Sequence, residues 1–260
     1  MIGIPKKIIQ VWVGDDANIP EYYQTSLDSI QRHMVARGWE YKLLKEPEIT
    51  EFIAREYPDF LDTYRSYPYD IQRADAIRPL WLKKYGGLYL DMDFELLAPL
   101  EKLFASNSDA YFLPSPDRDI FHTGLTNSIM ASKPGVSVWD RYIERLKIPT
   151  KPWIVGKHLE VMNSTGPVAL SKALAKSSGV YSTLPTTLLA PCSICNVDSC
   201  NKHTTNPNQL MRQLSGKSWH SIDSTAYNFL FCYRKYLYFI AAAVALTVVL
   251  VLVFRRKRNK

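Results

Sequence analysis

Two aspartates separated by one residue are the side chains of this sequence best suited to chemistry. Asp91 and Asp93 flank Met92 and follow a short apolar run. We expect residues 88–94 to form a strand, and residues two apart in a strand point to the same face. Two adjacent carboxylates repel each other unless a divalent cation lies between them, and hard cations such as Mg²⁺ and Mn²⁺ prefer carboxylate oxygens. The spacing therefore predicts a metal site.

A metal held by only two protein carboxylates keeps open coordination positions. A diphosphate can fill these positions, and the metal then neutralises the charge that develops when a bond to phosphate breaks. This is the chemistry of a transferase that uses a nucleotide-sugar. A metal-dependent phosphohydrolase with Asp91 as nucleophile is an alternative, although the apolar run at 94–97 is unlike the small turn-forming residues usual in those enzymes. A membrane-tethered scaffold that has lost catalysis is a third possibility.

A helix and a strand must position these aspartates. Apolar residues recur at steps of three and four over residues 70–85, which predicts a helix that ends at Gly86-Gly87. Asp75 and Arg78 are three residues apart and therefore share one face of this helix. Such a pair is either a surface ion pair or part of the site.

Strands and helices alternate along the rest of the sequence. The apolar, β-branched run at residues 8–13 predicts a buried first strand. The other predicted elements are helices over 22–35, 48–57, 136–146 and 167–176, strands over 40–44, 110–113 and 181–184, and a loop-rich stretch over 188–218. We also expect Pro79 to kink the helix at 70–85. The alternation predicts an α/β domain with a layered sheet.

Two blocks of the sequence resemble the DXD-containing sugar transferases of glycosyltransferase family 32. The blocks are residues 4–14 (IPKKIIQVWVG) and residues 73–103, and the second contains both aspartates. The family includes fungal α-1,6-mannosyltransferases and inositol-phosphoceramide mannosyltransferases and, more distantly, the glucosylating clostridial toxins. The resemblance implies a GT-A-like fold, the Rossmann-like fold of nucleotide-diphospho-sugar transferases, in one catalytic domain over residues 1–230. It also implies transfer of a hexose, most simply mannose, with retention of anomeric configuration.

The resemblance implies roles for the acidic residues and the arginine. Asp93 is expected to be the main metal ligand, and Asp91 to bind the metal through water or to contact the ribose. Arg78 is expected to bind phosphate or sugar hydroxyls, and Asp75 to accept hydrogen bonds from hydroxyls of the donor. The implied cofactors are Mn²⁺ or Mg²⁺ and a nucleotide-sugar donor, either GDP-mannose or a UDP-hexose.

Other binding residues are expected around these four. Trp12, at the end of the first strand, would stack on the nucleotide base. Tyr89, on the same strand face as Asp91, would line the donor pocket. Asn127 would face the acceptor. The family pattern usually has histidine where this chain has Gln10.

Weaker family matches lie at residues 126–135, at 165–167 and at Ser218-Trp219-His220. Trp219 is expected to close over the diphosphate. Ser218 or His220 would complete the metal shell, so His220 is a predicted metal ligand beside the two aspartates.

Residues 237–254 carry no charge and would span about 27 Å as a helix, close to the ~30 Å hydrocarbon core of a bilayer. We expect a transmembrane helix at 236–254 that contacts the lipid bilayer, followed by a basic tail at 255–260; a buried core helix is the alternative. The protein would then be a single-pass membrane protein with a C-terminal anchor in an endomembrane such as the ER or Golgi. A membrane-proximal glycan or glycolipid is the expected acceptor.

The side of the membrane on which the domain lies stays open. The positive-inside tendency places the basic tail in the cytosol. The first residues contain no apolar run long enough for a signal peptide, which favours tail-anchored insertion with a cytosolic domain.

The net charge does not indicate a nucleic-acid partner. Five of the seven net positive charges come from the tail at 255–260, so about two remain for the rest of the chain. The sequence therefore shows no basic stripe for DNA or RNA.

Cys192, Cys195, Cys200 and His203 form the pattern C-x2-C-x4-C-x2-H in a loop rich in Ser, Asn and Thr. The spacing does not match a common zinc finger. It is compatible with either a metal site or a disulfide staple.

Overall fold

The computed structural model describes residues 3–106, 108–117, 124–148, 156–177, 179–190, 192–197, 199–200, 206–214 and 221–258. The chain divides into a first unit, Met1–Trp219, and a second unit, His220–Lys260. Each unit is described by itself.

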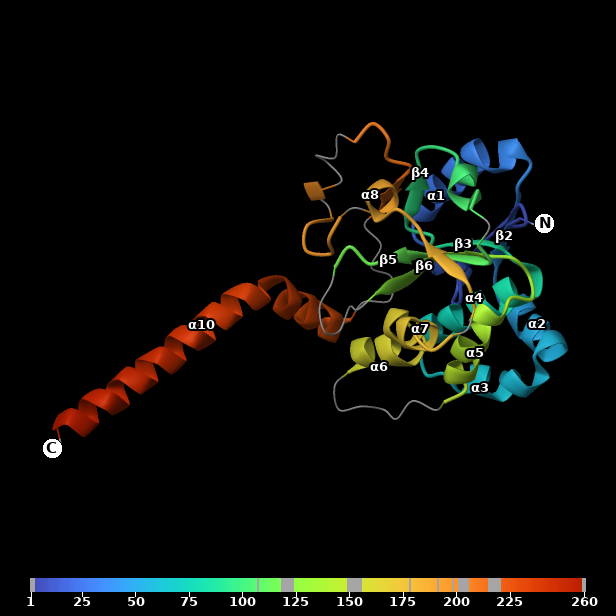
Figure 1. The fold of residues 1–260 in the computed structure, drawn as a ribbon. Coiled ribbons are helices and arrows are strands. Elements are labelled where there is room, and N and C mark those ends of the chain that lie inside the picture. Colours follow the sequence, from blue (N-terminus) through green and yellow to red (C-terminus); the bar gives the residue numbers. More distant parts are fainter. Residues whose placement is uncertain are drawn as a thin grey trace. The chain divides into compact units, whose positions relative to one another are not determined.

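A six-stranded mixed sheet forms the centre of the first unit (Figure 1). The strand order is β2-β1-β3-β6-β5-β7. The strands are β1 (Lys7–Val11), β2 (Glu40–Leu44), β3 (Gly87–Leu90), β5 (Ala110–Pro114), β6 (Leu125–Ser132) and β7 (Tyr181–Thr183). Strand β6 runs antiparallel to both of its neighbours, and the other pairs are parallel. A separate antiparallel pair joins β4 (Phe94–Leu96) to β8 (Met211–Gln213).

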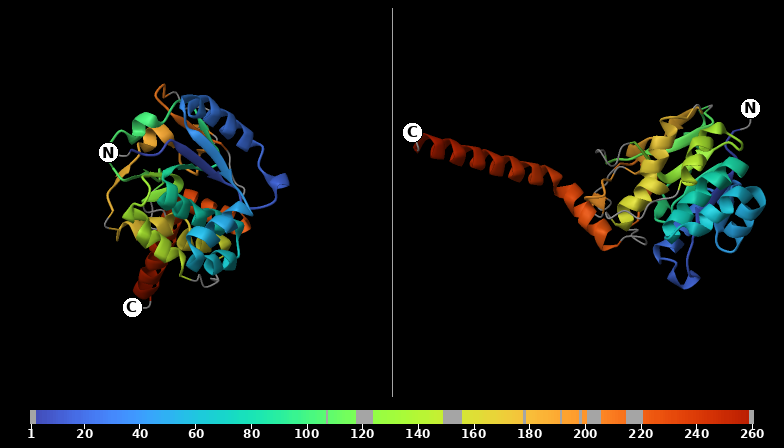
Figure 2. Two further views of the ribbon diagram at one scale, coloured as in Figure 1. Left: turned by 90° about the vertical axis from the view of Figure 1, so that its right-hand side faces the viewer. Right: turned by 90° about the horizontal axis from the view of Figure 1, so that it is seen from below.

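Helices cover both faces of the sheet, as the two turned views in Figure 2 also show. One face carries α2 (Glu48–Glu56), α3 (Leu61–Ser66), α4 (Asp70–Tyr85), α5 (Asp140–Leu146), α6 (Lys157–Ser164) and α7 (Pro167–Leu174). The other carries α1 (Tyr22–His33), α8 (Thr186–Leu189) and the β4–β8 pair. Short 3-10 helices lie at Asp16–Asn18, Val35–Arg37, Pro58–Phe60, Glu101–Phe104 and Ser137–Trp139. The predicted α/β layered architecture is confirmed.

The strands inside the sheet are mostly buried and apolar because both faces are covered there, whereas the edge strands β2 and β7 are largely exposed. Successive side chains alternate between two hydrophobic clusters, as the pleat requires. Ile8 and Leu88 belong to the cluster under α1, whereas Ile9 and Tyr89 belong to the cluster under α4. The apolar residues Ile8, Ile9 and Val11 of β1 therefore contribute to two cores at once.

Gly86 and Gly87 join α4 directly to β3. Both have positive φ, 66° and 104°, a conformation that glycine adopts at little cost. A Cβ at Gly87 would lie 2.6 Å from the Lys7 carbonyl oxygen, and one at Gly86 would lie 2.8 Å from the Ser132 carbonyl oxygen. The two glycines therefore end the helix as predicted and also let β3 insert between β1 and β6.

The predicted strand over residues 88–94 is wrong in its second half. β3 ends at Leu90, Asp91 to Asp93 form a turn, and β4 begins at Phe94. The two aspartates therefore do not share a strand face. They meet because the chain bends between two strands of different sheets.

Several elements were not predicted. β6 alternates half-buried and buried residues at its start, which gives a weak apolar signal, and α6 is short. In its described part, the stretch expected to be loop-rich contains β8 and the last two residues of α8 (Thr186–Leu189). Helix α4 matches the predicted range and continues through Pro79.

The second unit contains one long helix, α10 (Ile222–Arg258). Its residues Ile222–Val249 are apolar enough, and numerous enough, to cross a membrane. Many of its large apolar side chains are exposed, for example Phe239 at 75%. The predicted span at 236–254 lies within this helix. The predicted limits of the catalytic domain and the span stay predictions.

Candidate functional site

A cavity of about 450 Å³ opens at the carboxyl ends of β1 and β3. These strands are parallel neighbours, with Ile9 paired to Tyr89, so the residues that follow them emerge at the same edge of the sheet. The chain crosses from β1 to β2 on one side and returns to β3 on the other, and ligands of open α/β sheets bind at such reversals. The cavity is lined by residues 11–15, Tyr22, residues 68–71, Ala74, Arg78, Tyr89, residues 91–93 and Lys157.

The D-x-D turn is held through its backbone by three distant segments. The Asp91 N–H donates to the Ser128 carbonyl (2.8 Å), and the Leu214 N–H donates to the Asp93 carbonyl (2.6 Å). Gln10, which is completely buried, donates from Nε2 to the Asp91 carbonyl (3.1 Å). Gln10 therefore supports the turn from β1, at the position where the family pattern usually has histidine.

Among the described residues, one carboxylate oxygen of Asp93 has no hydrogen-bond partner. Its Oδ1 is buried without a hydrogen bond, and its Oδ2 is 3.5 Å from Gln213 Nε2. Burial, together with the charge of Asp91, raises the pKa of Asp93 to about 7. A buried carboxylate oxygen without a donor, beside a second carboxylate, is the environment that a divalent cation would relieve. The residues present therefore fit the predicted metal.

Asp91 is anchored on one oxygen. Its Oδ1 lies 3.3 Å from Arg78 Nη1 and accepts a hydrogen bond from the Tyr89 hydroxyl. Burial raises the pKa of Asp91, while the Arg78 charge and the Tyr89 hydrogen bond act in the opposite direction. Because 28% of the side chain is still exposed, Asp91 remains accessible from the cavity.

Arg78 is a fixed, buried cation beside the cavity. Its Nη1 is 3.1 Å from Asp75 Oδ1 and donates to the Asn127 carbonyl at 3.1 Å. Its guanidinium carbon lies 4.4 Å from the centre of the Tyr89 ring, a stacked cation–π contact. Burial alone would lower the pKa of Arg78, but Tyr89, Asp91 and Asp75 raise it, so the group stays charged. The pair of Asp75 and Arg78 is thus buried and is no surface ion pair.

Asp75 lies behind Arg78 with both oxygens occupied. Oδ1 accepts from Asn127 Nδ2 (2.9 Å) and Oδ2 from Thr165 Oγ1 (3.1 Å). Burial raises the pKa of Asp75 to about 7, against the lowering effect of the Arg78 charge. Neither Asp75 nor Asn127 is among the residues that line the cavity. Their predicted contacts with donor and acceptor stay predictions.

Aromatic side chains also line the cavity. Trp12 Nε1 donates to the Asp15 carbonyl (3.1 Å), which fixes the orientation of the indole. Tyr69 also lines the cavity, and Lys157 Nζ lies 5.3 Å from the centre of its ring. Neither Tyr69 nor Lys157 was among the site residues predicted from the sequence. Lys157 was missed because it reaches the site only through the packing of α6 on α4. Its one local signal is a lysine at a helix start.

The remaining predicted site residues, Ser218, Trp219 and His220, lie outside the described residues. Within the described part of the chain, no group of three or more His, Cys, Asp or Glu side chains is placed to hold a metal. The predicted role of His220 stays a prediction.

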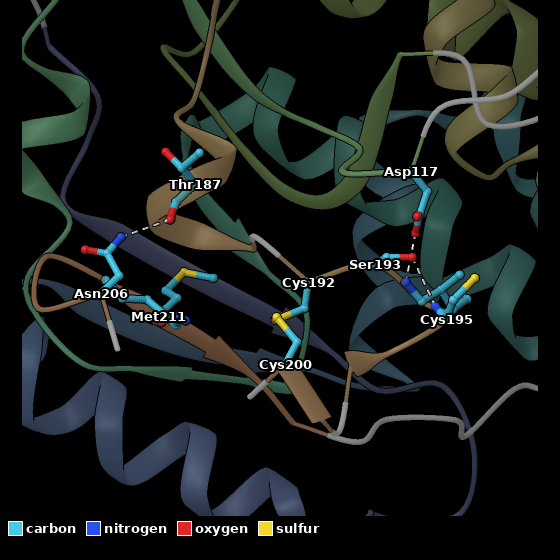
Figure 3. Close-up of a disulfide and its surroundings, with 10 residues drawn as sticks. Asp117, Thr187, Cys192, Ser193, Cys195, Cys200, Asn206 and Met211 are labelled. Carbon is cyan, nitrogen blue, oxygen red and sulfur yellow. Dashed lines mark hydrogen bonds between the residues drawn. A yellow bond between two sulfur atoms is a disulfide. The ribbon is translucent and has the colours of Figure 1, made fainter. Parts of the chain in front are cut away.

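The cysteine pattern is a disulfide staple rather than a zinc site. Cys192 and Cys200 are joined by a disulfide, with Cα atoms 5.7 Å apart (Figure 3). His203 lies outside the described residues. All three cysteines of the pattern are disulfide-bonded, so none of them is a free thiol for a metal.

Residues 20–109 match the family model described as "Glycosyltransferase sugar-binding region containing DXD motif". The matched segment contains Asp75, Arg78 and both aspartates of the turn. Over this segment the chain is similar to the DXD-containing glycosyltransferases. The predicted resemblance to this family is confirmed.

Two relatives of this glycosyltransferase come from fungi. Inositol phosphoceramide mannosyltransferase 1 of Schizosaccharomyces pombe is 29% identical over 264 residues, which cover 100% of this chain and 77% of that protein. Mannosyl phosphorylinositol ceramide synthase CSH1 of Saccharomyces cerevisiae is 32% identical over 225 residues, which cover 85% of this chain and 54% of that protein. The chain thus spans about half the length of the second relative.

The solved structures support the fold. The glycosyltransferase GlyE of Streptococcus pneumoniae superposes with a TM-score of 0.50 at 12% identity, covering 88% of this chain and 60% of GlyE. At this identity the likeness concerns the fold alone. The GT-A-like fold predicted from the sequence is confirmed.

Proposed function

We propose that this chain transfers a hexose, mannose in the simplest case, from a nucleotide-sugar to a glycolipid at a membrane. The observation that supports this most directly is the unpartnered, buried Oδ1 of Asp93 beside Asp91 at a 450 Å³ cavity. Asp91 and Asp93 would hold Mn²⁺ or Mg²⁺. The names of the relatives support mannose as the sugar and a phosphoinositol ceramide as the acceptor.

The chain's own residues would divide the work of donor binding. When bound, the metal would neutralise the diphosphate as the bond from the sugar to phosphate breaks. Arg78 provides a fixed positive charge next to that position, and Lys157 provides a second cation on the cavity wall. Trp12 would stack on the base. Asp75, Asn127 and Tyr89 hold the Arg78 guanidinium in one orientation. The arginine therefore does not need to move when negative charge develops on the diphosphate.

The donor assay tests this function. The full chain in detergent micelles would be incubated with GDP-mannose, UDP-glucose, UDP-galactose or UDP-N-acetylglucosamine, with and without Mn²⁺, and free nucleoside diphosphate would be measured. We expect metal-dependent turnover of GDP-mannose. Turnover of a UDP-sugar instead would change the proposed sugar, and failure to use any of the donors would favour a scaffold. Retention is proposed from the family and is read from the anomeric configuration of the transferred sugar by NMR.

Deletion of residues 236–260 tests the membrane anchor. The exposed apolar side chains of α10 form no part of a core in the second unit, so the shortened chain should remain folded and keep donor hydrolysis. It should also stay in the supernatant after ultracentrifugation without detergent, whereas the full chain should sediment with membranes. Loss of cooperative thermal unfolding in the shortened chain would show instead that the segment belongs to a core.

We also propose that the catalytic domain lies on the side of the membrane away from the cytosol. Disulfides such as Cys192–Cys200 form and persist in oxidising compartments. The basic residues after the span favour a cytosolic tail, which is the same orientation. This differs from the tail-anchored arrangement suggested by the first residues.

The orientation predicts the outcome of protease treatment of sealed vesicles. An epitope added after Lys260 should be removed by protease added outside ER and Golgi vesicles, while the domain stays intact until detergent is added. Digestion of the domain in sealed vesicles, with protection of the epitope, would establish the reverse orientation.

A further inference from the structure

A second cavity, of about 220 Å³, begins where the D-x-D turn ends. Phe94, the residue after Asp93, lines it, and so does Gln213, whose Nε2 lies 3.5 Å from Asp93 Oδ2. Ser128 also lines it, and its carbonyl accepts the Asp91 N–H. Each of these three residues lines the second cavity and also adjoins, or is hydrogen-bonded to, one of the proposed metal ligands.

Several polar side chains line this cavity, and two of them, Ser128 and Gln213, also contact the turn. Thr126 and Ser128 are two apart on β6, both half-buried, and their hydroxyl oxygens are 2.7 Å apart. The rest of the lining is largely apolar and comes from other elements: Met162 from α6 and Val168 from α7, together with Ile194. The cavity therefore has hydroxyl-binding groups at the turn and an apolar wall.

The disulfide-bonded loop forms part of that wall. Cys192 lines the cavity and is 4% exposed, and it is joined to Cys200. The Ile194 N–H donates to Asp117 Oδ2 at 2.8 Å. Figure 3 shows Asp117 next to Ser193 and Cys195 of this loop. The wall is thus fixed both covalently and by a charge-assisted hydrogen bond.

The lining excludes the donor as occupant. Among the described residues that form this cavity there is no Lys or Arg, and Asp117 contributes a carboxylate. A nucleoside diphosphate would find no cation here, whereas the first cavity offers Arg78 and Lys157. The volume of the second cavity, about 220 Å³, is below the ~300–1,000 Å³ usual for sites that hold drug-sized ligands. This volume suits a single ring rather than a lipid tail.

We propose that this second cavity binds the ring of the acceptor, an uncharged six-membered polyol such as an inositol or hexose ring. Its hydroxyls face Thr126, Ser128 and Gln213, and its C–H face packs against Met162 and Ile194. One hydroxyl is then held next to the D-x-D turn, where the sugar leaves the donor. This inference rests on the proposed transferase function and adds the position and chemistry of the acceptor.

Two variants of the full chain in detergent micelles test the site. Ile194→Glu places a charge on the apolar wall at a position that is 40% exposed, so the fold tolerates it. Thr126→Val removes one hydroxyl and keeps the side-chain shape. The matched control is Val180→Glu, at a position that is 63% exposed and outside both cavities.

Each protein would be assayed with GDP-mannose and Mn²⁺ for hydrolysis without acceptor and for transfer to inositol phosphoceramide or methyl α-D-mannoside. We expect the ratio of transfer to hydrolysis to fall at least tenfold in Ile194→Glu and about threefold to tenfold in Thr126→Val, through a higher KM for acceptor. Val180→Glu should keep the wild-type ratio.

The outcomes separate the two proposals. If the wild type hydrolyses no donor, the proposed function fails and this inference falls with it. If it hydrolyses donor but glycosylates neither probe, the acceptor class is wrong. If it transfers and both variants keep the wild-type ratio, the acceptor lies elsewhere although the transferase function stands.

Discussion

Replacing Asp93 with asparagine should lower sugar transfer at least about a hundredfold, because a divalent cation contributes several kcal/mol of charge stabilisation during such reactions. The isosteric amide keeps the shape of the side chain but removes a negative ligand. The same change should increase the stability of the metal-free protein. The buried side chain no longer carries a negative charge, and the repulsion from Asp91 disappears.

The stability gain should depend on pH. Because the pKa of Asp93 is raised from 3.8 to about 7 in the folded protein, ionisation of this carboxyl opposes folding increasingly between those two pH values and fully above them. Asp93→Asn should therefore unfold at a higher temperature than the wild type at pH 8, and the difference should shrink towards pH 4. At pH 8 we expect Asp93→Asn to exceed the wild type by about 1–2 kcal/mol in free energy of unfolding, or by roughly 2–8 °C in unfolding temperature. These values allow for the partial exposure of the side chain.

Differential scanning fluorimetry with and without Mn²⁺ checks both effects. Mn²⁺ together with GDP should raise the unfolding temperature of the wild type and leave that of Asp93→Asn unchanged. Asp59→Asn, at an exposed position in the 3-10 helix Pro58–Phe60, is the control and should behave like the wild type. Full transfer activity in Asp93→Asn would contradict the metal assignment.

Replacing Arg78 with methionine should destabilise the domain by about 3–5 kcal/mol and abolish transfer, because it leaves buried carboxylates without their cation. Asp75 and Asp91 both lie within 3.3 Å of Arg78 Nη1, and the Asn127 carbonyl would also lose its donor. Methionine fills a similar volume, so the effect would come from charge and hydrogen bonding. The urea dependence of unfolding, followed by tryptophan fluorescence, measures the loss.

A lysine at the same position separates folding from function. Arg78→Lys keeps the positive charge but cannot bond to several acceptors in one plane. It should recover part of the stability while transfer stays strongly reduced. Arg55→Met, which breaks an exposed ion pair with Glu56, should leave the urea midpoint unchanged within error. An Arg78→Met protein as stable as the wild type would show that Asp75 and Asp91 do not depend on this cation.

Much of the fold could be predicted because its signals are local. Helix α4 matches residues 70–85, since the apolar spacing and the terminal glycines both act within a few residues. The predicted ranges for β2 and the first four residues of β5 also agree with the structure. β6 was missed because its polar, half-buried start weakens the apolar pattern, and β8 because three residues carry too little periodicity.

The chemistry of the candidate site was visible in the sequence, but the contacts that organise it were not. Residue types and spacing identified Asp91 and Asp93 as functional candidates, because carboxylates two apart are a local pattern. The spacing of Arg78 was equally compatible with a surface ion pair, and its role was implied by the family resemblance. Tertiary structure decided that the aspartates lie in a turn and not on a strand face.

Long-range packing decided the rest. Gln10, Ser128 and Leu214 hold the turn from three distant parts of the chain, and each contributes one hydrogen bond that is invisible until the strands are placed. Packing also put Asp75 behind Arg78, brought Lys157 to the donor cavity and closed the Cys192–Cys200 loop over the second cavity. The sequence by itself therefore determined which groups could do chemistry, since this depends on side-chain type and local spacing. The tertiary structure decided what each group faces, since hydrogen bonds and burial depend on residues far away along the chain.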